Sequence, residues 1–128
     1  MPTIFTRIIQ GEIPSYVIRE SDQFYAFLDI RPISPGHTLV VPKIEVDELF
    51  DLDAEFLQQM LPFTRPIAHA LRKVTGLRVG MLVAGFEVPH AHMHLIPIRS
   101  ERDLDFGRAK PANDAELQVM QQLIAAEL

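Results

Sequence analysis

Residues 88–98, VPHAHMHLIPI, place a histidine at every second position of an otherwise apolar run. In an extended strand successive side chains point to opposite faces, so this spacing sets His90, His92 and His94 on one face. The intervening residues line the other face. Core packing alone favours Val or Ile at such positions, because a buried imidazole needs partners for both ring nitrogens. The run therefore predicts a strand with its histidines on one face, an arrangement that core packing alone does not explain.

The chain length of 128 residues predicts a single domain over residues 1–128, large enough to bury a core without covalent staples. Hydrophobic residues make up 48% of the chain and charged residues 23%, which is ordinary for a globular domain. Residues 100–128 are expected to form a C-terminal extension that ends in a helix.

Charge and cysteine content exclude several classes of protein. The formal net charge of -5 argues against a general nucleic-acid surface, which needs clustered Lys and Arg. The chain has no cysteine, so disulfides and thiolate zinc sites are excluded. Residues 1–15 are too polar for a signal peptide, and no run reaches membrane-spanning length. We therefore expect a cytoplasmic protein with neither nucleic acid nor membrane as a partner.

Aromatic and β-branched residues predict three strands in the first third of the chain, at residues 16–20, 23–30 and 37–42. The first two strands are joined at residues 21–22 and are expected to form a hairpin. Pro42 ends the third strand because proline cannot donate to a sheet ladder.

A helix is predicted to begin at Ala54, with Asp53 as its N-cap and Gly76 at its end. Its apolar residues keep helical spacing. Pro62 and Pro66 fall inside it, and each removes a backbone hydrogen bond. We expect a kink there or two helical pieces.

The fourth strand is predicted at residues 78–85, and the histidine run is the fifth. These two strands are expected to form a hairpin over residues 85–87. A final amphipathic helix is expected to start at Asn113 or Asp114, because Asn113 and Glu116 have the spacing of a capping box. Strands first, then a central helix and a closing helix, indicate an α+β fold with an antiparallel sheet.

Three interpretations of the histidine row remain open on the residues alone. The row could be a solvent-exposed strand face. It could bind a metal, because alternate strand positions can present two imidazoles to one zinc ion, although only Glu87 offers a nearby carboxylate. It could perform nucleophilic catalysis, in which one neutral histidine attacks phosphorus and its neighbours donate hydrogen bonds to the phosphate. His69, alone on the central helix, is interpreted as an ordinary surface residue.

The segment HAHMHLI, residues 90–96, resembles the signature of the histidine triad (HIT) family of nucleotide hydrolases and transferases. The segments TIFTRIIQGEIPS, FLDIRPISPGHTLVVPK and AGFEVPHAHMHLIP also resemble that family in order and separation, so the likeness covers residues 3–99. The resemblance implies an α+β fold with a five-stranded antiparallel sheet. It also implies a homodimer built around the central helix and fourth strand, and attack on the α-phosphate of a nucleotide.

The resemblance also implies a role for each histidine. His92 would be the nucleophile, and His94 would bind the phosphate and help protonate the departing group. His90 would support the position of the nucleophile, and His37 would complete the site from the third strand. A nearby protonated histidine could compensate the charge of the phosphate. Because imidazole is a good leaving group, a two-step route through a phosphohistidine suits His92.

The resemblance places a nucleoside site beside the histidines. The Asp29 carboxylate would accept hydrogen bonds from both ribose hydroxyls, although a strand-end turn former is the plainer interpretation of that residue. An apolar slot for a purine base would be lined by Ile4, Phe5, Ile8, Phe27, Leu28, Ile30 and Val88. Lys43 and Arg99 are interpreted chiefly as solvated surface charges.

The chain departs from the family pattern at four positions. Thr3 and Thr6 stand where many members carry the Cys-x-x-Cys half of a structural zinc site, so no structural zinc is expected. Glu45 stands where a histidine is common, and we expect it to alter the surroundings of His37. Phe86 occupies the position of a glutamine in a loop that normally helps to hold the phosphate or leaving group.

These observations predict a hydrolase of purine nucleoside 5'-phosphoramidates or related nucleotides that requires no metal or other cofactor. A dinucleoside polyphosphate hydrolase is the alternative within the same family. A non-catalytic nucleotide-sensing module, suggested by Phe86, and a metal-dependent hydrolase built on the histidine row are the alternatives from other classes.

Overall fold

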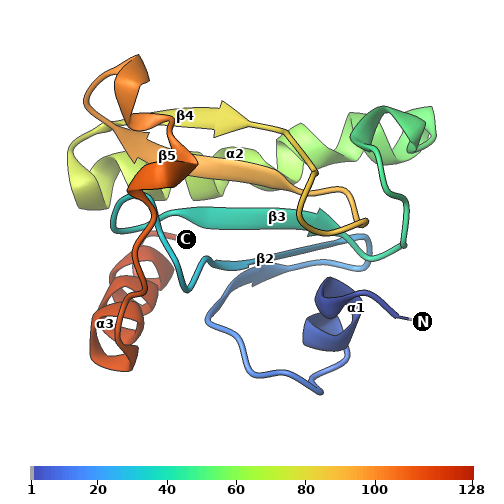
Figure 1. Ribbon diagram of the computed structural model, residues 1–128, viewed down its shortest axis with the longest axis horizontal. Helices are drawn as coiled ribbons and strands as arrows, with labels where there is room; N and C mark the ends of the chain where they lie inside the picture. The colour runs from blue at the N-terminus through green and yellow to red at the C-terminus, as the bar shows by residue number, and fades with distance from the viewer. Residues whose placement is uncertain (1) are drawn as a thin grey trace.

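A computed structural model describes residues 2–128 and contains one five-stranded antiparallel sheet (Figure 1). The strands follow the order β1-β2-β3-β5-β4. Their bounds are Val17–Glu20 for β1, Phe24–Leu28 for β2, Thr38–Pro42 for β3, Arg78–Leu82 for β4 and Met93–Ile98 for β5. The helices are α1 (Ile4–Ile9), α2 (Ala54–Thr75) and α3 (Asp114–Ala125). The predicted α+β class and antiparallel sheet are confirmed.

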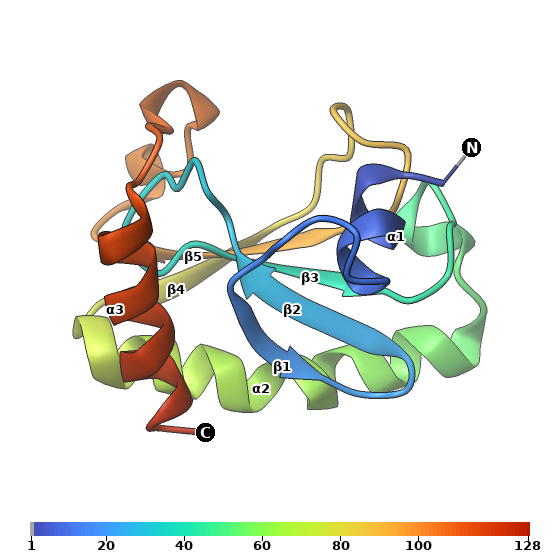
Figure 2. The same ribbon diagram turned by 90° about the horizontal axis from the view of Figure 1, so that it is seen from below.

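The sheet is covered on both faces, by α2 on one and by α1 on the other (Figure 2). Alternation along β2 divides its side chains between two cores. Phe24, Ala26 and Leu28 join the core beneath α2 and α3, whereas Tyr25 and Phe27 join the smaller core beneath α1. The histidine-bearing end of β5 belongs to the α1 side, because its intervening Met93 and Leu95 pack in the α2 core.

Helix α2 runs unbroken through both prolines, so the expectation of two helical pieces was wrong. Asp53 caps it by accepting the Phe56 backbone N–H at 3.0 Å, and Gly76 ends it with a left-handed φ of 71°. Pro62 and Pro66 are both exposed. They lie one turn apart on the outer face of the helix, where water can solvate the carbonyls that proline leaves without a donor.

The connection between β4 and β5 is longer than the predicted tight hairpin. The two strands pair antiparallel, but β4 ends at Leu82 and residues 83–92 form the connection. His90 and His92 therefore precede β5, and of the row only His94 lies within the strand. The backbone of this segment bonds elsewhere, since the Ala91 N–H donates to the carbonyl of Val46 at 2.6 Å.

The two ends of the chain fold locally. The hairpin between β1 and β2 and the N-cap of α3 at Asn113 are confirmed, the latter by a 2.8 Å bond from the Glu116 N–H to the Asn113 side chain. Helix α1 was not predicted, and Thr3 caps it by accepting the Thr6 N–H at 3.1 Å.

Among residues 2–128, no helix has both the length and the apolar character needed to cross a membrane.

Candidate active site

Four buried histidines meet at one edge of the α1 face of the sheet. His37 leads into β3, and the register of β3 against β5 brings it beside His94. The ring centroids of His37 and His94 are 5.1 Å apart, as are those of His92 and His94. His90 is fully buried and lies at the far end of the row. The structure thus brings together all four histidines singled out in the sequence.

Hydrogen bonds determine the tautomers of His37 and His94. The Ile33 backbone N–H donates to Nδ1 of His37 at 3.0 Å, so a neutral His37 carries its proton on Nε2. That Nε2–H donates to Nδ1 of His94 at 2.9 Å. A neutral His94 therefore carries its own proton on Nε2, where it is free to donate to a ligand.

His92 has the opposite tautomer. Its Nδ1 lies 2.8 Å from the carbonyl of His90, which can only accept, so Nδ1 carries the proton. When the ring is neutral, Nε2 holds a lone pair. No residue within 2–128 donates a hydrogen bond to this nitrogen, and no buried side-chain nitrogen of these residues lacks a partner, so Nε2 faces solvent. An acceptor nitrogen therefore stands beside the Nε2–H donor of His94.

The inner histidines are neutral in the unliganded site. Burial, with a smaller effect of nearby His94, lowers the pKa of His37 to about 3. Burial, with a smaller effect of His92, lowers the pKa of His94 to about 4. Desolvation penalises the charged ring in both cases. At neutral pH this pair of rings therefore offers a ligand the Nε2–H dipole of His94. It does not offer the positive charge that the sequence suggested.

Asp29 follows β2 and points toward the same histidines. Its Oδ1 accepts the Arg31 backbone N–H at 2.9 Å, which is the turn-forming role considered from the sequence. Its Oδ2 lies 3.7 Å from Nε2 of His37, and the side chain is 23% exposed. Burial raises the pKa of the Asp29 carboxyl, and the bond from Arg31 opposes that effect. One carboxylate oxygen thus holds the turn, and the other remains open to a ligand.

The apolar residues proposed to hold a base divide into three groups. Phe5, Ile8, Phe27 and Val88 belong to the core beneath α1. Phe5 also packs its ring against His92, with centroids 5.0 Å apart. Ile4 and Ile30 are exposed and can form the outer walls of a slot. Leu28 points to the α2 side of the sheet, as strand alternation requires, and packs in the other core.

A cavity of about 620 Å³ opens beside His92. The connection between β4 and β5 and the segment before α2 form its walls, which include Asp47, Glu48, Phe50, Phe86 and His92. Phe50 is 84% exposed and Phe86 is 97% exposed. Sequence reasoning singled out Phe86 but missed Phe50 and the acidic pair, because nothing local indicates that residues 47–50 lie opposite the histidines.

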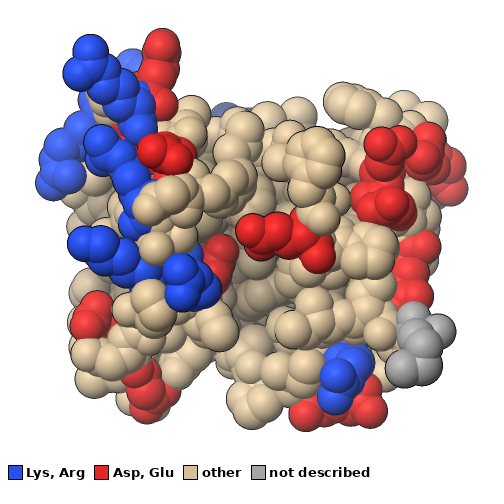
Figure 3. Space-filling view, viewed as in Figure 1, with Lys and Arg blue, Asp and Glu red and all other residues tan. Residues whose placement is uncertain are grey.

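Charge is unevenly distributed over this face of the molecule. Lys and Arg gather over the segment between β5 and α3, and Asp and Glu gather over the segment that precedes α2 (Figure 3). The basic segment also carries Phe106, whose ring packs against His94 with centroids 4.9 Å apart. This contact was missed, because the polar stretch that contains Phe106 has no motif. Lys43 lies apart from the histidines and pairs with Glu20 at 2.6 Å.

The histidine row does not fit a shared metal ion. Both ring nitrogens of His90 are bonded, to the Pro42 carbonyl at 2.8 Å and to the Thr3 hydroxyl at 2.7 Å. Ligand atoms of Asp29, His37 and His94 do lie within 4.8 Å of one another. The nitrogens that face each other there are already joined by a hydrogen bond, so a metal would have to displace a proton and break that bond.

Three of the four positions that depart from the family pattern form one hydrogen-bonded cluster, namely Thr3, Thr6 and Glu45. Oε1 of Glu45 accepts the Thr3 backbone N–H at 2.7 Å and the Thr6 hydroxyl at 2.6 Å. The expectation that Glu45 would alter the surroundings of His37 was wrong. Residues 43–46 turn away from β3 toward α1, so Glu45 reaches His90 through Thr3 instead.

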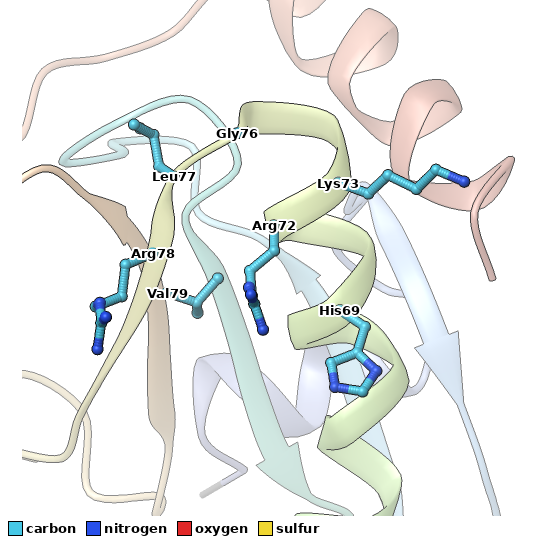
Figure 4. Close-up of a pocket in the computed structure, with 7 residues that line it drawn as sticks. All are labelled: His69, Arg72, Lys73, Gly76, Leu77, Arg78 and Val79. Atoms are coloured by element: carbon cyan, nitrogen blue, oxygen red, sulfur yellow. The ribbon is translucent and has the colours of Figure 1, made fainter.

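A second cavity, of about 870 Å³, lies away from the histidines between the end of α2 and the start of β4 (Figure 4). His69 and Arg72 point from α2 toward it, whereas Lys73 points away toward α3 and pairs with Glu127 at 2.9 Å. Its walls offer no nucleophile beside an acid or base. His69 is exposed, as its interpretation as a surface residue requires.

Comparison with known proteins gives a consistent result. The family model described as HIT domain matches residues 10–101. The adenosine 5'-monophosphoramidase HNT1 of Saccharomyces cerevisiae is 42% identical over 101 residues, which cover 77% of this chain and 64% of the yeast protein. An uncharacterized HIT-like protein of Borreliella burgdorferi is 36% identical, with 86% of this chain and 85% of that protein covered.

Solved structures share the whole fold. A Hit-like protein involved in cell-cycle regulation from Bartonella henselae has a TM-score of 0.86 and 31% identity, covering 98% of this chain and 96% of that one. A zinc-bound histidine triad family protein from Mycobacterium smegmatis has a TM-score of 0.80 and 30% identity, covering 97% of this chain and 91% of that one. Both likenesses extend past residue 101 into α3.

Proposed function

The chain belongs to the HIT domain family, and on that basis we propose that it hydrolyses purine nucleoside 5'-phosphoramidates through a covalent intermediate on His92. The observation that carries this proposal is the pairing of tautomers in the histidine row. His92 offers a solvent-facing lone pair on Nε2, and its neighbour His94 offers an N–H donor. A nucleophile beside a donor for phosphate oxygens is what phosphoryl substitution requires.

The first chemical step forms a bond between Nε2 of His92 and the α-phosphorus and breaks the bond from phosphorus to the leaving amine. The leaving nitrogen, which would accept a hydrogen bond from the Nε2–H of His94, takes up a proton from solvent as its bond to phosphorus breaks, so that the amine departs neutral. The imidazole ring of His92 becomes positively charged in this step. The carbonyl of His90, which already accepts the Nδ1–H of His92, stabilises that charge.

In the second step water attacks the phosphorus of the phosphohistidine and gives up one proton to solvent, which balances the proton taken up by the amine. The bond from phosphorus to Nε2 breaks, a nucleoside monophosphate is released, and His92 returns to its neutral form with its proton still on Nδ1. Imidazole is a good leaving group, so two easy displacements replace one difficult one. Neither step uses a metal ion or other cofactor.

The nucleoside is proposed to bind on the α1 side of the row. The open Oδ2 of Asp29 would accept from the ribose hydroxyls. Phe5, Phe27 and Val88 form the apolar floor beside the histidines, with the exposed Ile4 and Ile30 at the rim. No side chain of this slot has a polar group directed at a base, so discrimination between adenine and guanine should be weak.

The protein is also proposed to act as a cytoplasmic homodimer. Strand β4 is an edge of the sheet, and an apolar groove of about 720 Å³ runs between it and α2. Leu61 on α2 and Met81 on β4 line this groove and are 56% and 53% exposed. An open strand edge beside exposed apolar side chains favours pairing with a second copy of the chain.

Turnover of a fluorogenic adenosine 5'-phosphoramidate tests the proposed reaction. We expect multiple turnovers in the presence of a chelator, with adenosine monophosphate as the product. Binding of adenosine monophosphate without any turnover would support the sensing module instead. Loss of activity with the chelator, restored by zinc, would support the metal-dependent hydrolase.

Competition between substrates tests the leaving-group class. We expect an unlabelled adenosine phosphoramidate to suppress the fluorogenic reaction at a lower concentration than a diadenosine polyphosphate. The reverse order of potency would favour the dinucleoside polyphosphate hydrolase.

A further inference from the structure

We propose that Thr3, held in place by Glu45, is a positioning residue for the nucleophile, acting through His90. This inference rests on the proposed function of His92. It assigns a role to the cluster formed by Thr3, Thr6 and Glu45, none of which lies against the cavity beside His92.

The first link fixes the start of α1. Oε1 of Glu45 accepts both the Thr3 backbone N–H and the Thr6 hydroxyl, at 2.7 and 2.6 Å. These bonds lower the pKa of the Glu45 carboxyl, which therefore stays ionised at neutral pH. A charged acceptor shared by two donors of the first helical turn holds that turn more firmly than a neutral one. Thr3 is thus tied to the segment that follows β3.

The second link is the hydroxyl proton of Thr3. Two acceptors lie near it, Nδ1 of His90 at 2.7 Å and Oγ1 of Thr6 at 3.3 Å. Nε2 of His90 lies 2.8 Å from the Pro42 carbonyl and must carry the ring proton, which leaves a lone pair on Nδ1. Burial lowers the pKa of His90 and keeps the ring neutral. The shorter bond therefore runs from the Thr3 hydroxyl to Nδ1 of His90.

The third link joins His90 to the nucleophile. With both nitrogens bonded and the side chain fully buried, the His90 ring cannot turn without breaking two hydrogen bonds. Its carbonyl accepts the Nδ1–H of His92 at 2.8 Å and thereby sets the tautomer of that ring. The next backbone N–H, of Ala91, donates to Val46, the neighbour of Glu45. The 45–46 segment thus holds residues 90–91 both directly and through Thr3.

The α1 turn contributes one more constraint. Phe5 lies two residues after Thr3 and packs edge-on against both His90 and His92, with centroid distances of 5.7 and 5.0 Å. A shift of Thr3 would therefore move the aromatic wall of the nucleophile as well as its hydrogen-bonded support. Displacement of a reacting group by about 1 Å can cost on the order of 100-fold in rate.

Steady-state kinetics of Thr3→Val and Thr3→Ser test the proposal. Valine keeps the shape of threonine but can neither donate to His90 nor accept the Thr6 N–H, whereas serine keeps both bonds. We expect Thr3→Val to lower kcat by about 10-fold to 100-fold with KM within about twofold, and Thr3→Ser to retain kcat within about threefold. Thr75→Val is the matched control, since it removes a threonine hydroxyl bond of 2.7 Å to Leu71 at the far end of α2. It should leave kcat unchanged.

Histidine tautomers give a readout that does not depend on turnover. In long-range ¹H–¹⁵N spectra the wild type should show His90 protonated on Nε2 and His92 on Nδ1. In Thr3→Val the Nδ1 resonance of His90 should move toward that of a nitrogen without a donor. His90 protonated on Nδ1 in the wild type would overturn the proposal even if Thr3→Val failed to fold.

The kinetic outcomes separate the two proposals. A wild type that turns over no nucleotide would count against the proposed function alone, and the spectra would still decide the role of Thr3. An active wild type with equal kcat in Thr3→Val, or equal losses in Thr3→Val and Thr3→Ser, would overturn the positioning role.

Discussion

At the scale of single residues, the row of imidazoles gives an acceptor and a donor side by side without a buried charge. Three of the four rings are oriented by a backbone group. The Ile33 N–H orients His37, the Pro42 carbonyl orients His90, and the His90 carbonyl orients His92. His94 takes its orientation from His37. Because backbone groups cannot change their protonation, the tautomers stay fixed while the substrate and its charge come and go.

Replacement of the proposed nucleophile should abolish turnover without unfolding the protein. His92→Ala removes the nitrogen that is proposed to bond to phosphorus, whereas Asp29 and the proposed apolar slot remain, so a nucleoside monophosphate should still bind. Activity should fall by several orders of magnitude. Intact-protein mass spectrometry after rapid mixing at mildly alkaline pH should show a nucleotidyl adduct on the wild type and none on His92→Ala.

His69→Ala is the control for that experiment, because His69 is exposed on α2. It should keep both activity and the adduct. An adduct that maps to another histidine, or full activity in His92→Ala, would remove the assignment. His37→Ala and His94→Ala should lose about 10²-fold to 10⁴-fold, as expected when positioned donors are removed.

The buried histidines should make the protein sensitive to mild acid. In the unfolded chain His37 and His94 take up protons near pH ~6.5, but in the fold their pKa values are about 3 and about 4. The unfolded state therefore binds more protons below pH ~6.5, and the free energy of unfolding falls as pH falls through that range. Each histidine can contribute up to ~1.4 kcal/mol per pH unit.

Urea unfolding between pH 7 and pH 5 measures this slope, which corresponds to about three protons at most, because burial also lowers the pKa of His90. His37→Gln should reduce the slope, because one of these buried rings is lost. A wild-type stability that does not change across this range would show that the buried rings do not resist protonation.

At the scale of elements, local signals at the helix ends determine where the helices begin. Asp53 starts α2 and Asn113 starts α3, each by accepting a backbone N–H three residues ahead. The prolines within α2 do not override the amphipathic pattern, because both lie on its outer face. The connection between β4 and β5 is different, since its course depends on bonds to the 43–46 segment.

Loss of the α2 cap should destabilise the protein without affecting the histidine site. Asp53→Ala leaves the Phe56 N–H without its side-chain partner and should lower the free energy of unfolding by about 1 kcal/mol. Asp53→Asn keeps an acceptor oxygen and should stay within about 0.5 kcal/mol of the wild type. Chemical denaturation measures both variants. Equal stability of Asp53→Ala and wild type would show that the cap contributes nothing.

At the scale of the whole molecule, the sheet carries helices on both faces and has β4 as an edge strand. Strand β5 lies inside the sheet, between β3 and β4, and therefore holds His94 rigidly. Strand β4 lies at the edge, beside the apolar groove along α2. The sheet thus positions His94 through an inner strand. Its edge strand leaves an exposed apolar groove, where a second copy is proposed to pair.

A charge placed in the groove should separate the proposed dimer. Met81 is 53% exposed on β4, and Met81→Lys would put an ammonium group into the face that is proposed to pair with itself. Analytical ultracentrifugation at micromolar concentration should show a dimer for the wild type and a monomer for this variant. Val119→Lys is the matched control, because Val119 is 56% exposed on α3 and lies outside the groove. A monomeric wild type would refute the dimer.

The sequence alone predicted the five strands, α2 and α3, though not α1, and it singled out the four histidines. Alternation of apolar residues follows directly from strand geometry, and capping residues act over three positions, so both are readable locally. The HIT resemblance, which also comes from the sequence, added an expected role for each site residue. The bounds of α2 were predicted, but the sequence left open a kink or a break at its prolines, because it does not say which face of a helix meets solvent.

Only the tertiary structure decided how the histidines are bonded and what surrounds them. Pro42 and Thr3 supply the two partners of the His90 ring from 48 and 87 positions away. Phe50 and Phe106 reach the site from segments without a motif. The tautomer of a histidine depends on the group opposite each nitrogen, and that group is chosen by packing of distant segments, which no local pattern encodes.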